Sequence, residues 1–173
     1  MKDKYLTRPE DRISIKRKIA VGAGGFPIQN GGLIVQYMAQ PIFQIFLGLN
    51  PALFGLAMTI PRIWDAFTDP IMGRISDRFK SKWGRRRPFV FFGSLLMALS
   101  FSFIWMVPQG LSETSIFLWL VISSILFFSA YTIYSVPCQA LAYEQTSDYH
   151  ERTRLMFYWA LFFNIGNLCV NWY

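Results

Sequence analysis

The sequence predicts an all-α, polytopic membrane protein with five transmembrane helices. Hydrophobic residues make up 53% of the 173 residues and charged residues only 16%, whereas an ordinary soluble domain is about 25% charged. Runs of about 20 apolar residues are long enough to cross the hydrocarbon core of a bilayer, and runs of that length without strict alternation favour helices over strands. Five such runs cover about residues 19–49, 51–75, 88–107, 115–143 and 155–173.

The basic residues separate the loops into two sets. Seven Lys or Arg residues lie in residues 1–18, seven in 74–87 and two in 144–154, whereas loops 48–50 and 108–114 carry none. This is the positive-inside pattern, so we expect a cytoplasmic N-terminal segment, residues 1–18, and a location in the cell membrane. The net charge of +7 then reflects topology and contact with the anionic lipid bilayer, and no nucleic-acid partner is expected.

Several chemistries are excluded by what the sequence lacks. Two cysteines and one histidine exclude a disulfide framework, a Cys/His zinc site and the His-dependent hydrolases. An intramembrane aspartyl protease needs two aspartates on different helices that face each other, but Asp65 and Asp69 fall on one predicted helix. We therefore expect neither an enzyme nor a cofactor.

Three charged residues interrupt the second apolar run. Arg62, Asp65 and Asp69 stand at i, i+3 and i+7, which places them within about 60° of one another on a helix. Each charge at the membrane centre costs roughly 2.5–3.5 kcal/mol, so this face is expected to look onto protein or water. One interpretation is a structural Arg62–Asp65 pair with Asp69 at the interface. The other is a cation or proton site, because two close carboxylates resist joint ionisation unless a cation neutralises them.

Polar residues also follow one side of the first and fourth runs. Glutamines at 29, 36, 40 and 44 fall within about 80° on a helical wheel, and a shorter stripe in the fourth run is interrupted by Pro137. These stripes fit contacts between helices or a cavity whose amides bind a polyhydroxylated ligand. Interrupted helices with polar faces are typical of secondary transporters. The candidate substrate-binding residues are Gln29, Asn30, Gln36, Ser135 and Gln139.

Two stretches resemble a known family. Residues 73–87 contain G-x-x-x-D-R followed by G-R-R, which resembles the loop signature of the major facilitator superfamily. Residues 64–73 read W-D-A-F-T-D-P-I-M-G, which is similar to the glycoside–pentoside–hexuronide:cation symporters, the group that includes melibiose permease. Residues 134–141 and 144–153 resemble the fourth helix and following loop of the same group.

The resemblance implies a function. It implies a symporter that carries sugars or glycosides by alternating access and couples them to Na⁺ or H⁺, with Asp65 and Asp69 as the cation-binding pair. The sequence departs from the group where sugar-binding carboxylates and a stacking tryptophan are expected, because Gln29, Ser135 and Gln139 stand there. A sugar-like polar substrate remains implied, without its identity.

The cytoplasmic loops carry the remaining expectations. We expect Gly73 to allow a close helix approach, and Asp77 to favour an arginine or a helix N-terminus. We expect Arg78, Arg85 and Arg86 to pair with Glu144, Asp148 or Glu151 and so to latch one transporter state. The alternative is ordinary screened loop charge. The expected structural or gating residues are Arg62, Gly73, Asp77, Arg78, Gly84, Arg85, Arg86, Glu144, Asp148, Glu151 and Arg152.

The resemblance covers only the first part of such a transporter. Members of the superfamily have about twelve spans in two halves that rock against each other, so residues 19–173 resemble an incomplete N-terminal six-helix bundle. We expect the missing C-terminal half to be a partner, and expect no transport by the 173 residues alone. The alternatives are a major facilitator protein for a non-sugar solute such as a lipid, and a non-transporting membrane partner or sensor.

Overall fold

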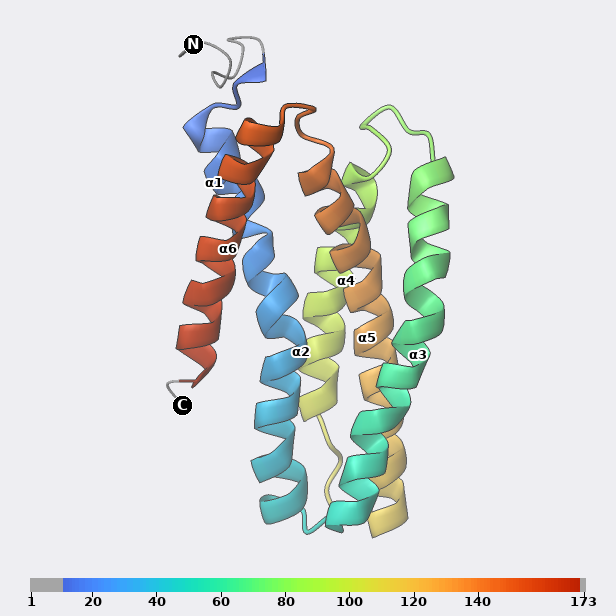
Figure 1. The fold of residues 1–173 in the computed structure, drawn as a ribbon. Coiled ribbons are helices and arrows are strands. Elements are labelled where there is room, and N and C mark those ends of the chain that lie inside the picture. The colour runs from blue at the N-terminus through green and yellow to red at the C-terminus, as the bar shows by residue number, and fades with distance from the viewer. Residues whose placement is uncertain (1–10, 172–173) are drawn as a thin grey trace. The chain divides into compact units, whose positions relative to one another are not determined.

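A computed structural model describes residues 11–171, without the side chains of Gln29, Val170 and Asn171. The described residues form helices and no strand, which confirms the all-α fold class. Figure 1 shows the helices joined by short loops. In chain order they are α1 (Ile15–Ala23), α2 (Gly25–Ala39), the π-helix η3 (Gln40–Phe46), α3 (Pro51–Arg78), α4 (Arg87–Trp105), α5 (Glu113–Tyr143) and α6 (Tyr149–Asn171).

The first apolar run differs from its prediction, because it folds as three helical pieces instead of one helix. Gly24 separates α1 from α2, and its N–H donates to the carbonyl of Val21 in a tightened turn. The proline at 41 has no N–H to donate, and η3 follows there with wider i→i+5 hydrogen bonds, such as Leu47 N–H to the carbonyl of Ile42 at 2.9 Å. The widened turns shift the later glutamines relative to the wheel of a regular α-helix.

The second run begins with a side-chain cap followed by a proline, a pair typical of a helix start. The side-chain oxygen of Asn50 accepts a hydrogen bond of 2.8 Å from the N–H of Ala52, and Pro51 occupies the first turn of α3. Among the described helices, α4 and α5 are the two that are long and apolar enough to cross a membrane by length and composition. The charges within α3 make that helix less apolar, and the breaks in the first run make its helices shorter, so neither segment has the length and composition of such a helix.

The chain divides into two compact units, one containing the residues up to Gly31 and those from Cys138 onward. In this first unit α1 lies beside α6 (Figure 1). A Cβ atom added to Gly22 would stand 3.0 Å from the backbone of Tyr158, so the glycine permits the close approach of the two helices.

The second unit contains Gly32–Pro137. Its core joins η3, α3, α4 and α5, and includes fully buried Phe43, Ile104 and Leu120. A close backbone approach lies between α4 and α5, where a Cβ atom on Gly93 would stand 2.7 Å from the backbone nitrogen of Tyr134. By contrast, a Cβ atom on Gly73 would meet only Val136 Cγ1 at 3.9 Å, an ordinary contact. Among the described residues, Gly93 therefore allows a close helix approach in this unit, and the close approach expected at Gly73 remains a prediction.

Candidate cation and substrate site

Asp65 sits in the middle of α3 with part of its carboxylate buried. Its Oδ1 atom has no hydrogen-bond partner among the described residues, and none of the ion pairs found among them involves Asp65. A buried carboxylate oxygen without a partner is costly. This carboxylate is therefore available to a ligand and is not held in the structural Arg62–Asp65 pair that was one interpretation of the sequence.

Asp69 lies one turn further along α3 and contacts α5. Its Oδ1 atom accepts a hydrogen bond of 2.8 Å from the hydroxyl of Thr132, which is only 2% exposed. The rest of the Asp69 side chain is exposed. Two carboxylates on one helix face and a hydroxyl from a neighbouring helix thus provide oxygen atoms, the ligand type that hard cations prefer.

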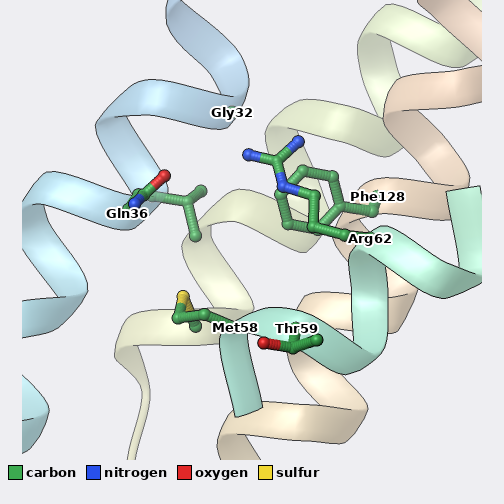
Figure 2. Close-up of a pocket in the computed structure, with 7 residues that line it drawn as sticks. Gly32, Gln36, Met58, Thr59, Arg62 and Phe128 are labelled. Atoms are coloured by element: carbon green, nitrogen blue, oxygen red, sulfur yellow. The ribbon is translucent and has the colours of Figure 1, made fainter. Parts of the chain in front are cut away.

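Arg62, one turn before Asp65, turns toward an aromatic ring. Its guanidinium carbon lies 4.8 Å from the centre of the Phe128 ring, a cation–π distance. Figure 2 shows the guanidinium directed from α3 toward Gly32 and Gln36 of α2. These side chains line a cavity of about 240 Å³, whose lining residues are Gly32, Val35, Gln36, Met58, Thr59, Arg62 and Phe128.

The five candidate substrate residues have different environments. Gln36 reaches the Arg62 cavity. Asn30 is 1% exposed and donates to the carbonyl of Phe26 at 2.7 Å, so it is largely a packed residue. Ser135 is buried and Gln139 exposed, while the side chain of Gln29 lies outside the described residues. Asn30 and Gln139 belong to the first unit, and Gln36 and Ser135 to the second.

Two contact residues were missed by the sequence reasoning. Phe128 and Thr132 on α5 meet the charged face of α3, but neither was singled out. Together with Ser135 they stand at i, i+4 and i+7, so they share one face of a helix. That spacing is the signal that identifies Thr132.

The loop after α3 is organised by two local interactions. Asp77 pairs with buried Arg86. Gly84 has φ of +100°, a conformation that favours glycine, and its carbonyl accepts a hydrogen bond of 3.0 Å from the hydroxyl of Ser81. The arginine partner expected for Asp77 is therefore Arg86 of its own loop.

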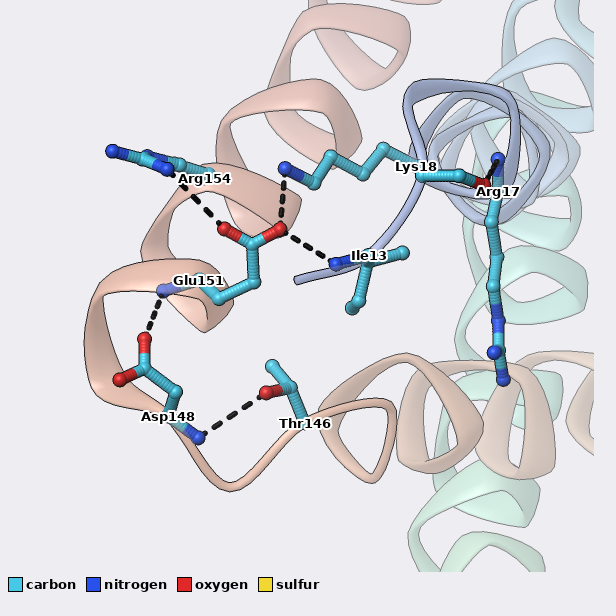
Figure 3. A network of polar contacts seen from close by, with 8 residues as sticks. Ile13, Arg17, Lys18, Thr146, Asp148, Glu151 and Arg154 are labelled. Carbon is cyan, nitrogen blue, oxygen red and sulfur yellow. Dashed lines mark hydrogen bonds and ion pairs between the residues drawn. The ribbon is translucent and has the colours of Figure 1, made fainter. Parts of the chain in front are cut away.

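A second polar cluster surrounds Glu151 at the start of α6 (Figure 3). The N–H of Ile13 donates to Oε1 at 2.9 Å, Lys18 Nζ lies 2.5 Å from the same oxygen, and Arg154 Nη1 lies 3.4 Å from Oε2. Asp148 caps the helix by accepting from the N–H of Glu151 at 2.7 Å. Arg152 donates to the carbonyl of Thr146 at 3.0 Å.

The charge of Glu151 is stabilised by these partners. Burial alone would raise the pKa of this carboxyl group. Hydrogen bonds from Lys18 and Ile13, with the positive charges of Lys18 and Arg154, outweigh burial and hold the pKa below its usual value. Glu151 is therefore engaged within its own unit, and its place in a latch with Arg78, Arg85 or Arg86 remains a prediction.

No group of three or more His, Cys, Asp or Glu side chains that would hold a metal ion occurs in residues 11–171 as described.

Comparison with known proteins identifies the family of the chain. Residues 20–172 match the family described as MFS/sugar transport protein. The chain belongs to the MFS/sugar transport protein family. Membership confirms the resemblance to major facilitator glycoside–cation symporters that the two motifs indicated, and it makes this chain part of a membrane transporter family.

Several members of the family are similar to the chain over most of its length. It is 34% identical to an uncharacterized symporter, sll1374, of Synechocystis sp. over 151 residues, covering 84% of this chain and 28% of that protein. It is 30% identical to the inner membrane symporter YicJ of Escherichia coli over 83% of this chain and 31% of that protein. It is 29% identical to mouse sodium-dependent lysophosphatidylcholine symporter 1, over 84% of this chain and 28% of that protein. The chain thus spans less than a third of the length of these relatives, which are symporters and not enzymes.

Proposed function

We propose that this chain forms the first part of a cation-coupled symporter that carries a sugar or glycoside across a cell membrane by alternating access. Asp65 and Asp69 hold the coupling ion, Na⁺ or H⁺. The N-terminal segment is cytoplasmic, and the second half of the transporter completes the substrate path. Family membership and the printed names of the relatives support the symporter class.

The observation that carries the proposal is the unpaired Asp65 oxygen one turn from Asp69. An unpaired carboxylate is costly where water is scarce, and the negative charges of Asp65 and Asp69 repel each other. A bound cation offsets both costs, and Thr132 adds a neutral oxygen beside Asp69. Arg62 forms no ion pair with Asp65 among the described residues, which leaves the Oδ1 atom of Asp65 to a bound ion.

A lipid cargo is the second candidate, and one observation favours it. Mouse, chicken and frog proteins named sodium-dependent lysophosphatidylcholine symporter 1 are 29%, 29% and 32% identical to this chain. Because these names pair sodium with a lipid, similarity to this group does not by itself imply a sugar. A non-transporting membrane partner is the third possibility, and it predicts no cation dependence.

The test is uptake by the complete transporter in proteoliposomes, with sodium and pH varied independently. The panel contains neutral sugars, glycosides and lysophosphatidylcholine. We expect one class to be taken up with a sodium or proton gradient, and Asp69→Asn to abolish that dependence. Asp11→Asn, a carboxylate lost from the N-terminal segment, is the matched control and is expected to retain it. Uptake that is indifferent to both ions, or unchanged in Asp69→Asn, would reject the proposal.

A further inference from the structure

We infer that Arg62, with Gln36, forms a binding site for an anionic group of the transported solute, a carboxylate or a phosphate. The inference rests on the proposed function, since it names a chemical class for the substrate of that same transporter. It starts from an arginine that lies in the membrane part of the chain beside two acids and pairs with neither.

The guanidinium of Arg62 has unused hydrogen-bonding capacity. It offers five N–H donors in a planar fork, and neither a hydrogen bond nor an ion pair engages them among the described residues; its described contact is the face of Phe128, 4.8 Å away. The ring attracts the cation but accepts no directed hydrogen bond comparable to a carboxylate oxygen. Ionisable residues inside a membrane mark functional sites by default, and this one is directed into a cavity (Figure 2).

The cavity has the size and lining for one polar group. Its volume of about 240 Å³ is just below the roughly 300–1,000 Å³ of sites that hold a whole drug-sized ligand. Gln36 contributes an amide with donors and an acceptor. Thr59 donates its hydroxyl to the carbonyl of Gly55 at 2.8 Å, so its oxygen is left to accept from a ligand hydroxyl.

The chemistry of the fork selects the ligand. Arginine binds carboxylate and phosphate oxygens bidentately, in short charge-assisted hydrogen bonds. A neutral sugar can accept hydrogen bonds from the guanidinium of Arg62 but does not neutralise its positive charge. A lysine at this position would supply the positive charge without the planar fork. Replacing Arg62 by lysine therefore separates the effect of charge from the effect of bidentate hydrogen bonding.

The position of Arg62 also connects the anion to the coupling ion. Asp65 is three residues further along the same helix, and its negative charge disfavours an anion at Arg62. A cation bound at Asp65 and Asp69 removes that repulsion, so it strengthens anion binding at the neighbouring site. Each ligand raises the affinity of the other by the same factor, which is the linkage that symport requires.

The experiment measures binding by calorimetry to the purified complete transporter, with and without sodium at constant ionic strength. Two matched pairs of probes distinguish the sources of the anion: methyl glucuronide against methyl glucoside, and lysophosphatidylcholine against monoacylglycerol. We expect the charged member of one pair to bind more tightly, and that pair identifies the source. Arg62→Gln is expected to weaken that member by roughly 10- to 100-fold, the factor carried by one or two charge-assisted hydrogen bonds, and to change its neutral partner less than about twofold. Arg62→Lys is expected to fall between.

Arg74→Gln removes an exposed arginine from the same helix, outside the cavity, and is the matched control that should change neither member. Gly32→Ala is a second variant, because its methyl group would meet Arg62 Nη2 at 3.5 Å, an ordinary contact that keeps the fold yet narrows access to the fork. It is expected to weaken the charged probe selectively. Equal affinities for the charged and neutral members of both pairs would overturn the inference, and so would a preference for the charged member that survives Arg62→Gln and Gly32→Ala. In either case, cation-dependent uptake of a neutral solute would leave the proposed function standing. Loss of cation dependence with an intact, Arg62-dependent preference would overturn the proposed function instead.

Discussion

The ammonium group of Lys18 lies 2.5 Å from Oε1 of Glu151, and the two side chains are 9% and 1% exposed. The same oxygen accepts the backbone N–H of Ile13 at 2.9 Å. The Glu151 carboxylate therefore links the first turn of α6 to α1 and to the segment that precedes α1 (Figure 3).

We expect Glu151→Gln to lower the free energy of unfolding by about 1–3 kcal/mol, because it leaves the buried Lys18 charge without its partner. Arg154→Gln is the matched comparison. Arg154 contacts the same carboxylate at 3.4 Å but is 59% exposed, so its loss is expected to cost less than about 0.5 kcal/mol. Thermal unfolding in detergent measures both. Equal losses for the two variants would show that burial does not govern this cluster.

The Glu151 cluster also predicts a pH dependence. The ordinary pKa of this carboxyl group is 4.5, and its pKa in the folded protein is lower, so the unfolded chain binds the proton more readily. The stability that the charged carboxylate contributes is therefore fully present above its unfolded pKa and is lost as pH falls through the folded pKa. We expect the wild type to exceed Glu151→Gln in stability at neutral pH and the difference to shrink below about pH 4.5. A pH series of unfolding midpoints checks this, and a difference that persists undiminished into strong acid would contradict it.

The sequence predicted the parts of this fold that depend on local chemistry. An asparagine before a proline, as at Asn50 and Pro51, is a local signal for a helix start, and the i, i+3, i+7 spacing placed Arg62, Asp65 and Asp69 on one face. The position of the break at Gly24 was not predicted, because the first run contains several glycines and two prolines and any of them could interrupt a helix.

The partners of the charged face were harder to predict than the face itself. Phe128 is one of 17 phenylalanines, and nothing in the sequence marks it as the ring beneath Arg62. Thr132 meets Asp69 across 63 positions of chain, a contact that only the packing of α5 against α3 creates. The choice between a structural Arg62–Asp65 pair and a free acid likewise depended on a rotamer, which a helical wheel does not determine.

The hydrogen bond between Thr132 and Asp69 gives a prediction for the coupling ion. Thr132→Val keeps the shape of the side chain but removes the hydroxyl that donates to Asp69 at 2.8 Å. We expect the apparent affinity for the coupling cation to fall by roughly 10- to 100-fold, the factor of a hydrogen bond to a charged group. The measurement is the cation concentration that gives half-maximal uptake by the complete transporter.

Two controls accompany that variant. Thr132→Ser retains a hydroxyl and is expected to retain most of the cation affinity. Thr68→Val removes a hydroxyl next to Asp69 that donates instead to the carbonyl of Trp64 at 3.2 Å, so it is expected to leave the affinity within about twofold. If Thr68→Val were as harmful as Thr132→Val, the loss would reflect a disturbed helix and not a lost oxygen at the ion site.

The packing of α4 on α5 gives the last prediction. A Cβ atom on Gly93 would stand 2.7 and 2.8 Å from the backbone N and Cα atoms of Tyr134, and backbone atoms yield only if the two helices move apart. We expect Gly93→Ala to lower the free energy of unfolding by about 1–3 kcal/mol, as overpacking does. Gly55→Ala is the matched control on α3, where nothing lies within 4 Å of the added atom. There the methyl group is expected to be neutral or to stabilise by up to about 1 kcal/mol, because alanine favours a helix over glycine. Unfolding midpoints of the two variants in the same detergent decide the matter, since a Gly93→Ala protein as stable as Gly55→Ala would mean that the helices are not held at this distance.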